Sequence, residues 1–177
     1  RFPVLEKVYG IIILFLMIPF IVLVVPLFKI SVKMHLFNTH IGLVLTSIAT
    51  ASIYIMFFFR QSFKAFPFEI IQAARVDGAG EFRIFFSILI PEMIPIYATA
   101  TIFSFTTSWN TYMWPLIMLQ TEKLRTITLM ISTMPSANFP EYGVIMVAIV
   151  IATLPTLIVF FVFQKYFVQG MLGAIKQ

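Results

Sequence analysis

The sequence predicts an all-α polytopic membrane protein, and two observations carry that prediction. Of its 177 residues, 60% are hydrophobic and only 11% are charged, with a mean hydropathy of +1.01. Soluble domains average roughly 45–50% apolar and about 25% charged residues. The apolar residues also form continuous runs close to the roughly 20 residues that a spanning helix needs. A transmembrane barrel would show short alternating segments instead.

Four spans are expected, at residues 8–28, 41–59, 85–108 and 142–163. Pro19 and Pro26 should kink the first span, which membrane helices tolerate when neighbours satisfy the freed carbonyls. The helix of the third span should begin earlier, near Phe82. After it, residues 109–125 are aromatic and broken by proline, which is typical of an interfacial or re-entrant segment.

Positive charge is distributed unevenly among the five segments that flank these spans. The first, third and fifth segments hold eight Lys and Arg residues, and the second and fourth hold four. The excess marks the cytoplasmic side, so both chain ends and the section Arg60–Glu92 should face the cytoplasm. The basic residues lie at the ends of apolar runs, so the net charge of +5 reflects orientation and not nucleic-acid binding. Because the chain opens with Arg1 and not methionine, we expect an N-terminal part to be missing.

The most polar part of the chain predicts two short helices joined by a tight turn. Pro67 suits a first helical turn, and FEIIQAARV then reads as a helix. Gly78 is a natural stop because glycine adopts left-handed angles without a steric cost, and a second helix can begin at Glu81. The small residues permit close approach by a partner, and the mixed charges can pair across an interface. A solvated connector between two spans is the alternative.

The stretch QAARVDGAGEFRIFFSILIP resembles the signature cytoplasmic loop of permease subunits of binding-protein-dependent ABC importers. That pattern is Glu-Ala-Ala, three residues, Gly, nine residues, Ile, any residue, Leu-Pro. The positions that match it are Ala73, Ala74, Gly78, Ile88 and Pro91. Gln72 and Ile90 depart from it, and Gln72 replaces a Glu that helps to tie the family's loop to its ATPase. The departure affects that contact and not the mode of docking.

Three other segments and the flank of this loop resemble the carbohydrate-uptake subfamily, of the maltose-transporter type. They are ARVDGAGEFRIF, SWNTYMWPL, EKLRTITL and QKYFVQGMLGAIK. The resemblance covers nearly the whole chain and implies a type I ABC importer transmembrane domain that normally has two further spans upstream. It implies a permease for sugar uptake whose loop at about residues 64–84 couples it to an ATPase. The coupling residues it implies are Gln72, Ala73, Ala74, Arg75, Asp77, Gly78 and Glu81.

The resemblance also implies the partners. They are a second permease subunit in a heterodimer, two cytoplasmic ATPase subunits and an extracytoplasmic solute-binding protein, in the inner membrane of a prokaryote. The chain has no phosphate-binding loop of the GxxxxGK[ST] kind. We therefore expect a non-catalytic subunit with no cofactor of its own, and ATP and Mg²⁺ bound by the ATPase subunits.

Hydroxyl side chains form stripes on the second and third spans and predict a pathway lining. The residues are Thr46, Thr50 and Tyr54 on the second span, and Tyr97, Thr101, Ser104 and Ser108 on the third. Polar faces within a membrane must point at protein or water, and a sugar needs hydrogen-bond partners. Packing between helices through hydroxyl residues is the alternative reading.

Two other groups lie at the outer side of the predicted bilayer. Trp109, Asn110, Tyr112 and Trp114 read as an aromatic belt or as a contact for an external binding protein. His35 and His40 share one loop, but with no carboxylate or cysteine nearby a metal site is disfavoured.

Other functional classes fit the sequence less well. A secondary transporter or channel would place ionisable residues inside its spans, and an intramembrane enzyme would need a catalytic constellation there. The cores of all four runs lack Asp, Glu, Lys, Arg and His. A polyol or a glycerol-phosphate-type compound remains an alternative solute.

Overall fold

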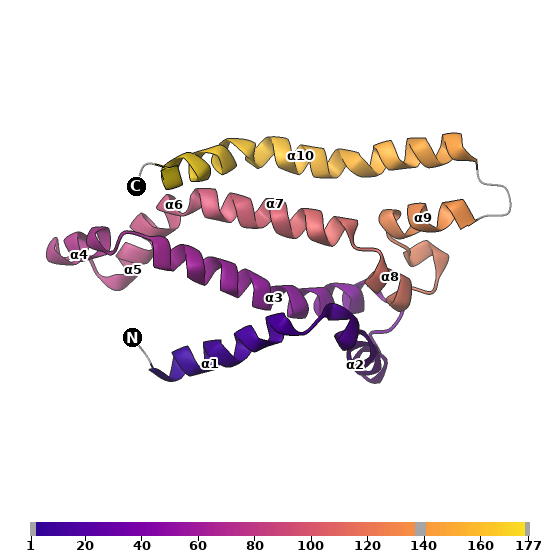
Figure 1. The fold of residues 1–177 in the computed structure, drawn as a ribbon, viewed down its shortest axis with the longest axis horizontal. Coiled ribbons are helices and arrows are strands. Elements are labelled where there is room, and N and C mark those ends of the chain that lie inside the picture. Colours follow the sequence, from indigo (N-terminus) through magenta and orange to yellow (C-terminus); the bar gives the residue numbers. More distant parts are fainter. Residues whose placement is uncertain (1–2, 137–140, 176–177) are drawn as a thin grey trace.

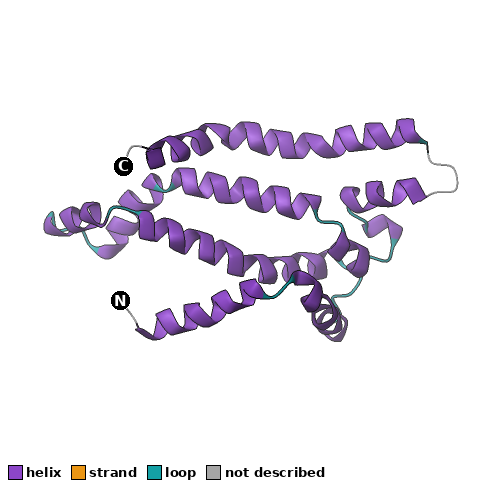
Figure 2. Ribbon diagram, in the orientation of Figure 1, coloured by secondary structure: helices purple, strands orange, loops and turns teal. Residues whose placement is uncertain are grey.

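The computed structural model describes residues 3–136 and 141–175, and within them it contains helices and no strand (Figure 2). The all-α prediction is therefore confirmed. The α-helices are α1 (Pro3–Leu14), α2 (Phe20–Lys33), α3 (His40–Ala65), α4 (Phe68–Val76), α5 (Glu81–Ile84), α6 (Ile90–Glu92), α7 (Ile94–Asn110), α8 (Met113–Met118), α9 (Ile127–Thr133) and α10 (Tyr142–Ile175). Single turns of 3-10 helix lie at η1 (Phe15–Met17), η3 (Glu122–Leu124) and η4 (Met134–Ser136), and a π-helix lies at η2 (Phe85–Leu89).

Four helices lie side by side along the long axis, in the order α1, α3, α7, α10 (Figure 1). One end of the bundle carries α4 and α5, with both ends of the chain nearby, and we call it the α4 end. The other end carries α2, α8 and α9, and we call it the α8 end. The arrangement puts the chain ends and the section after Arg60 on one side, as the charge distribution predicts.

Two helices, α3 and α10, are each long and apolar enough to cross a membrane. Two bent pairs also qualify if each pair counts as one span. They are α1 with α2, bent by 103°, and the segment Glu81–Glu92 with α7, bent by 63°. Within the described residues, length and composition thus allow between two and four spans, and the predicted number of four lies at the upper limit.

The prediction of one kinked helix over residues 8–28 is wrong. α1 ends at Leu14, and α2 begins at Phe20 in a new direction and continues to Lys33. Pro19 has no N–H to continue the helical ladder, and it pushes the preceding Ile18 into an extended conformation (φ −81°, ψ 115°). Pro26 lies inside α2, which continues past it. The break therefore forms at one of the two prolines only.

The other helix boundaries also differ from the expected spans. α3 continues beyond residue 59 to Ala65, and α10 begins at Tyr142 as expected but continues beyond 163 to Ile175. Polar side chains end an apolar run without ending a helix, because they tolerate helical angles as well. The helix expected from Phe82 onward begins at Glu81 but breaks at Met93, where Pro95 opens α7.

Burial is concentrated at the α8 end of the bundle. Trp114, Met118 and Leu119 form a cluster in which each is at most 2% exposed. Side chains from α2, from the α2–α3 loop and from the start of α3 pack around it. Along α10, by contrast, many large apolar side chains remain exposed, as expected for a surface that faces lipid.

Candidate functional site

The first candidate site is the α4–α5 element, residues 68–84, which projects from one end of the bundle (Figure 1). α4 covers the nine residues predicted from the sequence. It ends in a Schellman motif, in which Ala79 N–H donates to Ala74 O and Gly78 N–H donates to Arg75 O, both at 3.0 Å. Gly78 has φ of +80°, and α5 begins at Glu81. The predicted helix–glycine turn–helix is therefore confirmed as a local structure.

An ion pair closes the turn. Arg75 donates from Nε to Glu81 Oε1 at 2.8 Å and from Nη2 to Glu81 Oε2 at 3.1 Å. These bonds lower the pKa of the Glu81 carboxyl and raise the pKa of the Arg75 guanidinium. The sequence places both charges in the site as partners for another protein, whereas the structure pairs them with each other. They consequently bridge α4 and α5 across the turn.

The surface of the α4–α5 element is unusually apolar for an exposed turn. Val76 is 88% exposed and Phe82 is 83% exposed, while Phe68 is about half exposed. Among the predicted coupling residues, Ala74 is buried, and Gln72, Ala73, Asp77 and Gly78 are exposed. From the sequence, Phe82 is expected only at the start of the helix of the third span, and Val76 is not singled out. Exposed apolar side chains on a projecting element indicate an interaction surface.

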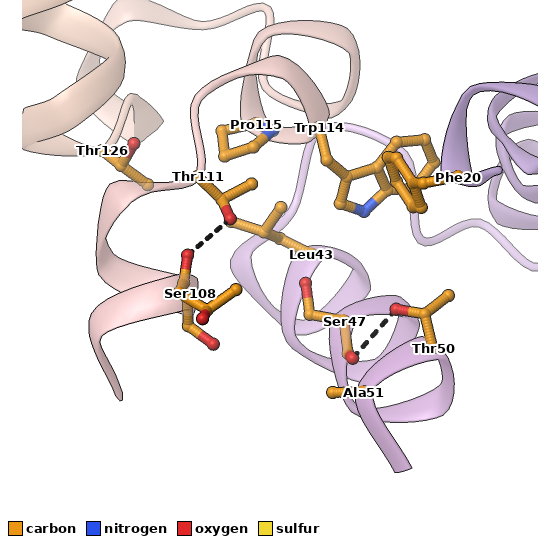
Figure 3. A pocket seen from close by; sticks show the side chains of 11 residues that line it. Phe20, Leu43, Ser47, Thr50, Ala51, Ser108, Thr111, Trp114, Pro115 and Thr126 are labelled. Atoms are coloured by element: carbon orange, nitrogen blue, oxygen red, sulfur yellow. Dashed lines mark hydrogen bonds between the residues drawn. The ribbon is translucent and has the colours of Figure 1, made fainter. Parts of the chain in front are cut away.

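The second candidate site is a pocket of about 330 Å³ between α3 and α7, closed by the start of α2 and by α8 (Figure 3). Six of its eleven lining residues carry hydroxyl groups: Ser47, Thr50, Thr107, Ser108, Thr111 and Thr126. Phe20 and Trp114 lie together at one end of the pocket, with ring centroids 6.0 Å apart. The described lining contains no ionisable side chain.

The predicted pathway residues do not converge on this pocket. Ser108 and Thr50 line it, whereas Tyr97, Thr101 and Ser104 are not among its lining residues. The Tyr97 ring packs on Phe59, and Thr101 Oγ1 donates to Tyr97 O at 2.8 Å. Of the predicted stripe on the third span, Ser108 therefore lines the pocket, Tyr97 packs on Phe59, and Thr101 is exposed and bonds its own helix.

Two hydroxyl residues of the second predicted span serve packing. Thr46 is buried, and its Oγ1 accepts a 2.8 Å hydrogen bond from Trp114 Nε1 and donates to Gly42 O at 2.7 Å. The Tyr54 ring stacks on Phe103 with centroids 4.9 Å apart. For these residues the alternative reading, contact between elements through hydroxyl and aromatic groups, describes the structure.

The aromatic belt expected after the third span is wrong for its tryptophans. Trp114 is only 2% exposed and belongs to the core cluster. Trp109 Nε1 donates to Ala152 O of α10 at 2.9 Å, which ties α7 to α10. Tyr112 and Asn110 remain exposed. A Trp-Pro pair in a short helix is equally compatible with a core and with an interface, so the sequence alone could not decide between them.

Asn38 joins two loops at the α8 end that are far apart in sequence. It has φ of +56°, and its Oδ1 accepts from the backbone N–H groups of Gln120 and Thr121 at 2.9 and 3.1 Å. Its Nδ2 donates to Thr121 Oγ1 at 2.8 Å, and His40 Nε2 lies 2.8 Å from Leu124 O. In the part of the chain that the structure describes, no group of three His, Cys, Asp or Glu side chains gathers around a metal-sized space.

Residues 5–173 match the family of binding-protein-dependent transport system inner membrane components. The chain belongs to this family. The match includes both candidate sites and every described helix of the bundle, although α1 and α10 extend slightly beyond it. The resemblance found in the loop sequence is therefore confirmed for the chain as a whole.

Relatives of this chain carry names from several transport systems. It is 51% identical to the lactose transport system permease protein LacG of Rhizobium radiobacter, over 97% of this chain and 62% of that one. It is 35% identical to the arabinooligosaccharides transport system permease protein AraQ of Bacillus subtilis, over 96% of this chain and 60% of that one. It is 30% identical to the sn-glycerol-3-phosphate transport system permease protein UgpE of Yersinia pestis, over 99% and 63%. The chain thus spans about three fifths of the length of these relatives.

A solved structure supports the fold. A chain of a bacterial ABC transporter involved in the import of the acidic polysaccharide alginate matches with a TM-score of 0.68, over 92% of this chain and 62% of that one. At 24% identity the likeness concerns the fold alone. The fold of this permease is that of a type I ABC importer transmembrane domain.

Proposed function

We propose that the whole protein is the membrane-spanning permease subunit of an ATP-driven importer that takes up a saccharide. The α4–α5 element is the observation that carries this proposal. It is a rigid, locally closed structure with two almost fully exposed apolar side chains, Val76 and Phe82, at the end of a helical bundle. Such a surface serves a protein partner.

The partner of the α4–α5 element is a cytoplasmic ATPase. The chain lacks a phosphate-binding loop of its own, so ATP and Mg²⁺ bind to two such ATPase subunits, and this chain remains non-catalytic. A second, different permease subunit completes the pathway, and an extracytoplasmic solute-binding protein delivers the solute. The transport systems named for the relatives LacG and AraQ support a sugar as the transported compound.

The α4 end faces the cytoplasm of a prokaryotic cell and the α8 end faces outward. The eight-to-four distribution of Lys and Arg supports this orientation. The position of both chain ends at the α4 end supports it too, because a cytoplasmic α4–α5 element then requires a cytoplasmic C-terminus.

A pair of glycine variants tests the role of the α4–α5 element. Gly78 has φ of +80°, whereas Gly80 has φ of −71°, and an added Cβ would meet no atom within 4 Å at either position. Gly78→Val therefore strains the turn by about 1 kcal/mol or more, while Gly80→Val introduces the same side chain without that strain. We expect Gly78→Val to insert normally but to lose the co-purifying ATPase or the coupling of ATP hydrolysis to uptake.

The measurement is co-purification of the ATPase with the full-length permease, followed by solute-stimulated hydrolysis in the reconstituted complex. Gly80→Val should retain most of both signals. Wild-type values for Gly78→Val in both assays would exclude this turn as the coupling structure. Equal loss in the two variants would show that bulk matters at the turn and not backbone conformation.

A further inference from the structure

We infer that the pocket between α3, α7 and α8 is a binding subsite for one unit of an uncharged saccharide on this subunit, and that it discriminates against phosphate esters. The inference rests on the proposed function, which names a saccharide, and adds to it the residues that bind the solute and the exclusion of phosphate esters. Lactose and arabinooligosaccharide permeases and a glycerol-phosphate permease are all relatives, so membership of the family leaves this choice open.

The hydroxyl groups of the pocket are available to a ligand. Ser47 is half-buried. Within the described residues, the hydroxyl groups of Ser47, Thr107 and Ser108 form no hydrogen bond. Thr50 and Thr111 donate to backbone carbonyls of their own helices, which leaves their oxygens able to accept. Figure 3 shows Ser108 in the last turns of α7 and Thr111 just beyond that helix on one side, with Ser47 and Thr50 on α3 on the other. Hydrogen-bond donors and acceptors on two opposite sides of the pocket suit a polyhydroxylated solute.

The aromatic end of the pocket complements the other surface of a sugar. The Trp114 N–H is already bonded to Thr46, so the indole is held in one orientation, with Phe20 packed edge-on against it. Small-molecule sites generally combine apolar and aromatic walls with a few placed polar groups. The volume of about 330 Å³ is near the lower end of the roughly 300–1,000 Å³ usual for such sites, so the pocket accommodates a small unit of a longer solute.

The absence of charged side chains from the described pocket lining favours a neutral saccharide over a phosphate ester. None of the eleven lining residues is Lys, Arg or His, and none is acidic. A phosphate group that leaves water needs cationic or multiple N–H partners, because burial of an unpaired charge is costly. A neutral saccharide loses only hydrogen bonds to water, which the hydroxyl walls replace.

Two interruptions of helices lie at the pocket and are independent of its side-chain chemistry. Phe20 is the first residue of α2 after the 103° break, and Thr111 lies in the gap between α7 and α8. Interrupted helices at membrane depth are tolerated where backbone lines a cavity or is buried in protein, and they mark solute sites in transporters. Six hydroxyl groups facing lipid would be unfavourable, so the pocket faces protein or water, and a position on the pathway meets that requirement.

Uptake by the assembled transporter, built with the full-length permease, tests the inference. The probes are radiolabelled neutral di- and trisaccharides, including lactose, and radiolabelled sn-glycerol 3-phosphate. We expect uptake of at least one saccharide and none of the phosphate ester. Combining Ser47→Ala with Ser108→Ala should raise the KM for the saccharide roughly three- to tenfold or more. Ser52→Ala, on an exposed part of α3 where the hydroxyl bonds Ile48 O, should leave KM unchanged.

A second pair of variants fills space instead of removing hydroxyl groups. Ala51 and Ala49 are both exposed on α3, but only Ala51 lines the pocket. Ala51→Leu should lower uptake at a given solute concentration, and Ala49→Leu should not. Amounts of inserted permease and basal ATP hydrolysis serve as controls for folding.

The outcomes separate the two proposals. A transporter that imports a saccharide with wild-type KM in both the Ser47/Ser108 and Ala51 variants would overturn the subsite and leave the proposed function intact. Import of glycerol phosphate and of no saccharide would overturn both the subsite and the saccharide that the proposed function names, and would leave an ATP-driven importer of another solute. Failure of the assembled complex to couple ATP hydrolysis to any uptake would remove the proposed function, and the inference with it.

Discussion

The two ends of the bundle are built by different kinds of interaction. At the α4 end, the α4–α5 element is closed by bonds between residues at most six positions apart, namely the Schellman motif and the Arg75–Glu81 pair. At the α8 end, the bonds join residues 68 to 84 positions apart: Thr46 with Trp114, Asn38 with Thr121 and His40 with Leu124. The α4–α5 element is thus held by local, exposed bonds, whereas the α8 end is held by non-local bonds around a buried cluster.

This difference between local and non-local bonds indicates which part of the chain can keep its shape when other helices shift. A locally closed element needs no support from distant helices, so it can transmit motion as one rigid piece. The α8 end depends on the simultaneous packing of α2, α3 and α8 around Trp114. A change there should affect folding, whereas a change in the α4–α5 element should affect coupling and leave folding intact.

The largest expected effect is at Gly42, in the first turn of α3. A Cβ at this position would lie 2.0 Å from Leu36 O and 2.8 Å from the Leu36 carbonyl carbon, both of which belong to the backbone. We expect Gly42→Ala to destabilise the protein by about 3 kcal/mol, the upper part of the usual cost of overpacking. Thermal unfolding of the purified full-length protein in detergent measures it.

Gly10→Ala is the matched control for Gly42→Ala. Gly10 lies inside α1, and an added Cβ would meet nothing within 4 Å. Alanine has the higher helix propensity, by about 1 kcal/mol, so this variant should be neutral or stabilising. Equal unfolding temperatures for the two variants would contradict the close approach of Leu36 to α3.

The next effect concerns the hydrogen bond between Trp114 and Thr46. Thr46→Val should cost about 1–3 kcal/mol, because it leaves the buried Trp114 N–H without its partner. Trp114→Phe should cost a similar amount, because it removes the same bond and leaves unfilled space in the core cluster, although Thr46 still donates to Gly42 O. In the double variant the losses should fall short of their sum by about 1 kcal/mol, since the two residues share one bond. Trp109→Phe, whose N–H bonds Ala152 instead, should combine additively with Thr46→Val. If the losses were additive both for Trp114→Phe with Thr46→Val and for Trp109→Phe with Thr46→Val, that result would argue against a hydrogen bond between Trp114 and Thr46.

The smallest effect is expected at the Arg75–Glu81 pair, which is exposed. Its hydrogen bonds hold the Glu81 pKa below the usual glutamate value of about 4.3. The contribution of this ion pair to the stability of the folded state is therefore fully present above about pH 4.3, the usual glutamate pKa. It is lost as the pH falls through the lowered pKa that Glu81 has in the folded state. Arg75 stays charged throughout, because its pKa is raised from an already high value.

Hydrogen exchange at Gly78 and Ala79 checks this pair. Glu81→Gln should speed exchange modestly at neutral pH and at low salt, and the difference from wild type should shrink at high salt. Asp77→Asn is the comparison, since Asp77 caps α4 and takes no part in that ion pair. A Glu81→Gln effect that persists at high salt would show that something other than the charge holds the turn.

The sequence by itself determined the elements that depend on neighbours along the chain. The hydropathy of the runs predicted α3 and the start of α10, and the order Pro67, Gly78, Glu81 predicted α4, its left-handed end and the start of α5. These features depend on backbone preferences of single residues and on periodicity, which are local properties. The loop pattern likewise sufficed to identify the family.

Only the tertiary structure decided where apolar and hydroxyl residues go. It broke the first run at Pro19 and left Pro26 inside a helix, and it buried Trp114 on Thr46 instead of placing it in a belt. It also divided one hydroxyl stripe between a pocket and packing contacts. In an apolar chain nearly every face can meet lipid, so composition does not distinguish lipid-facing from buried positions, and contacts between distant segments decide.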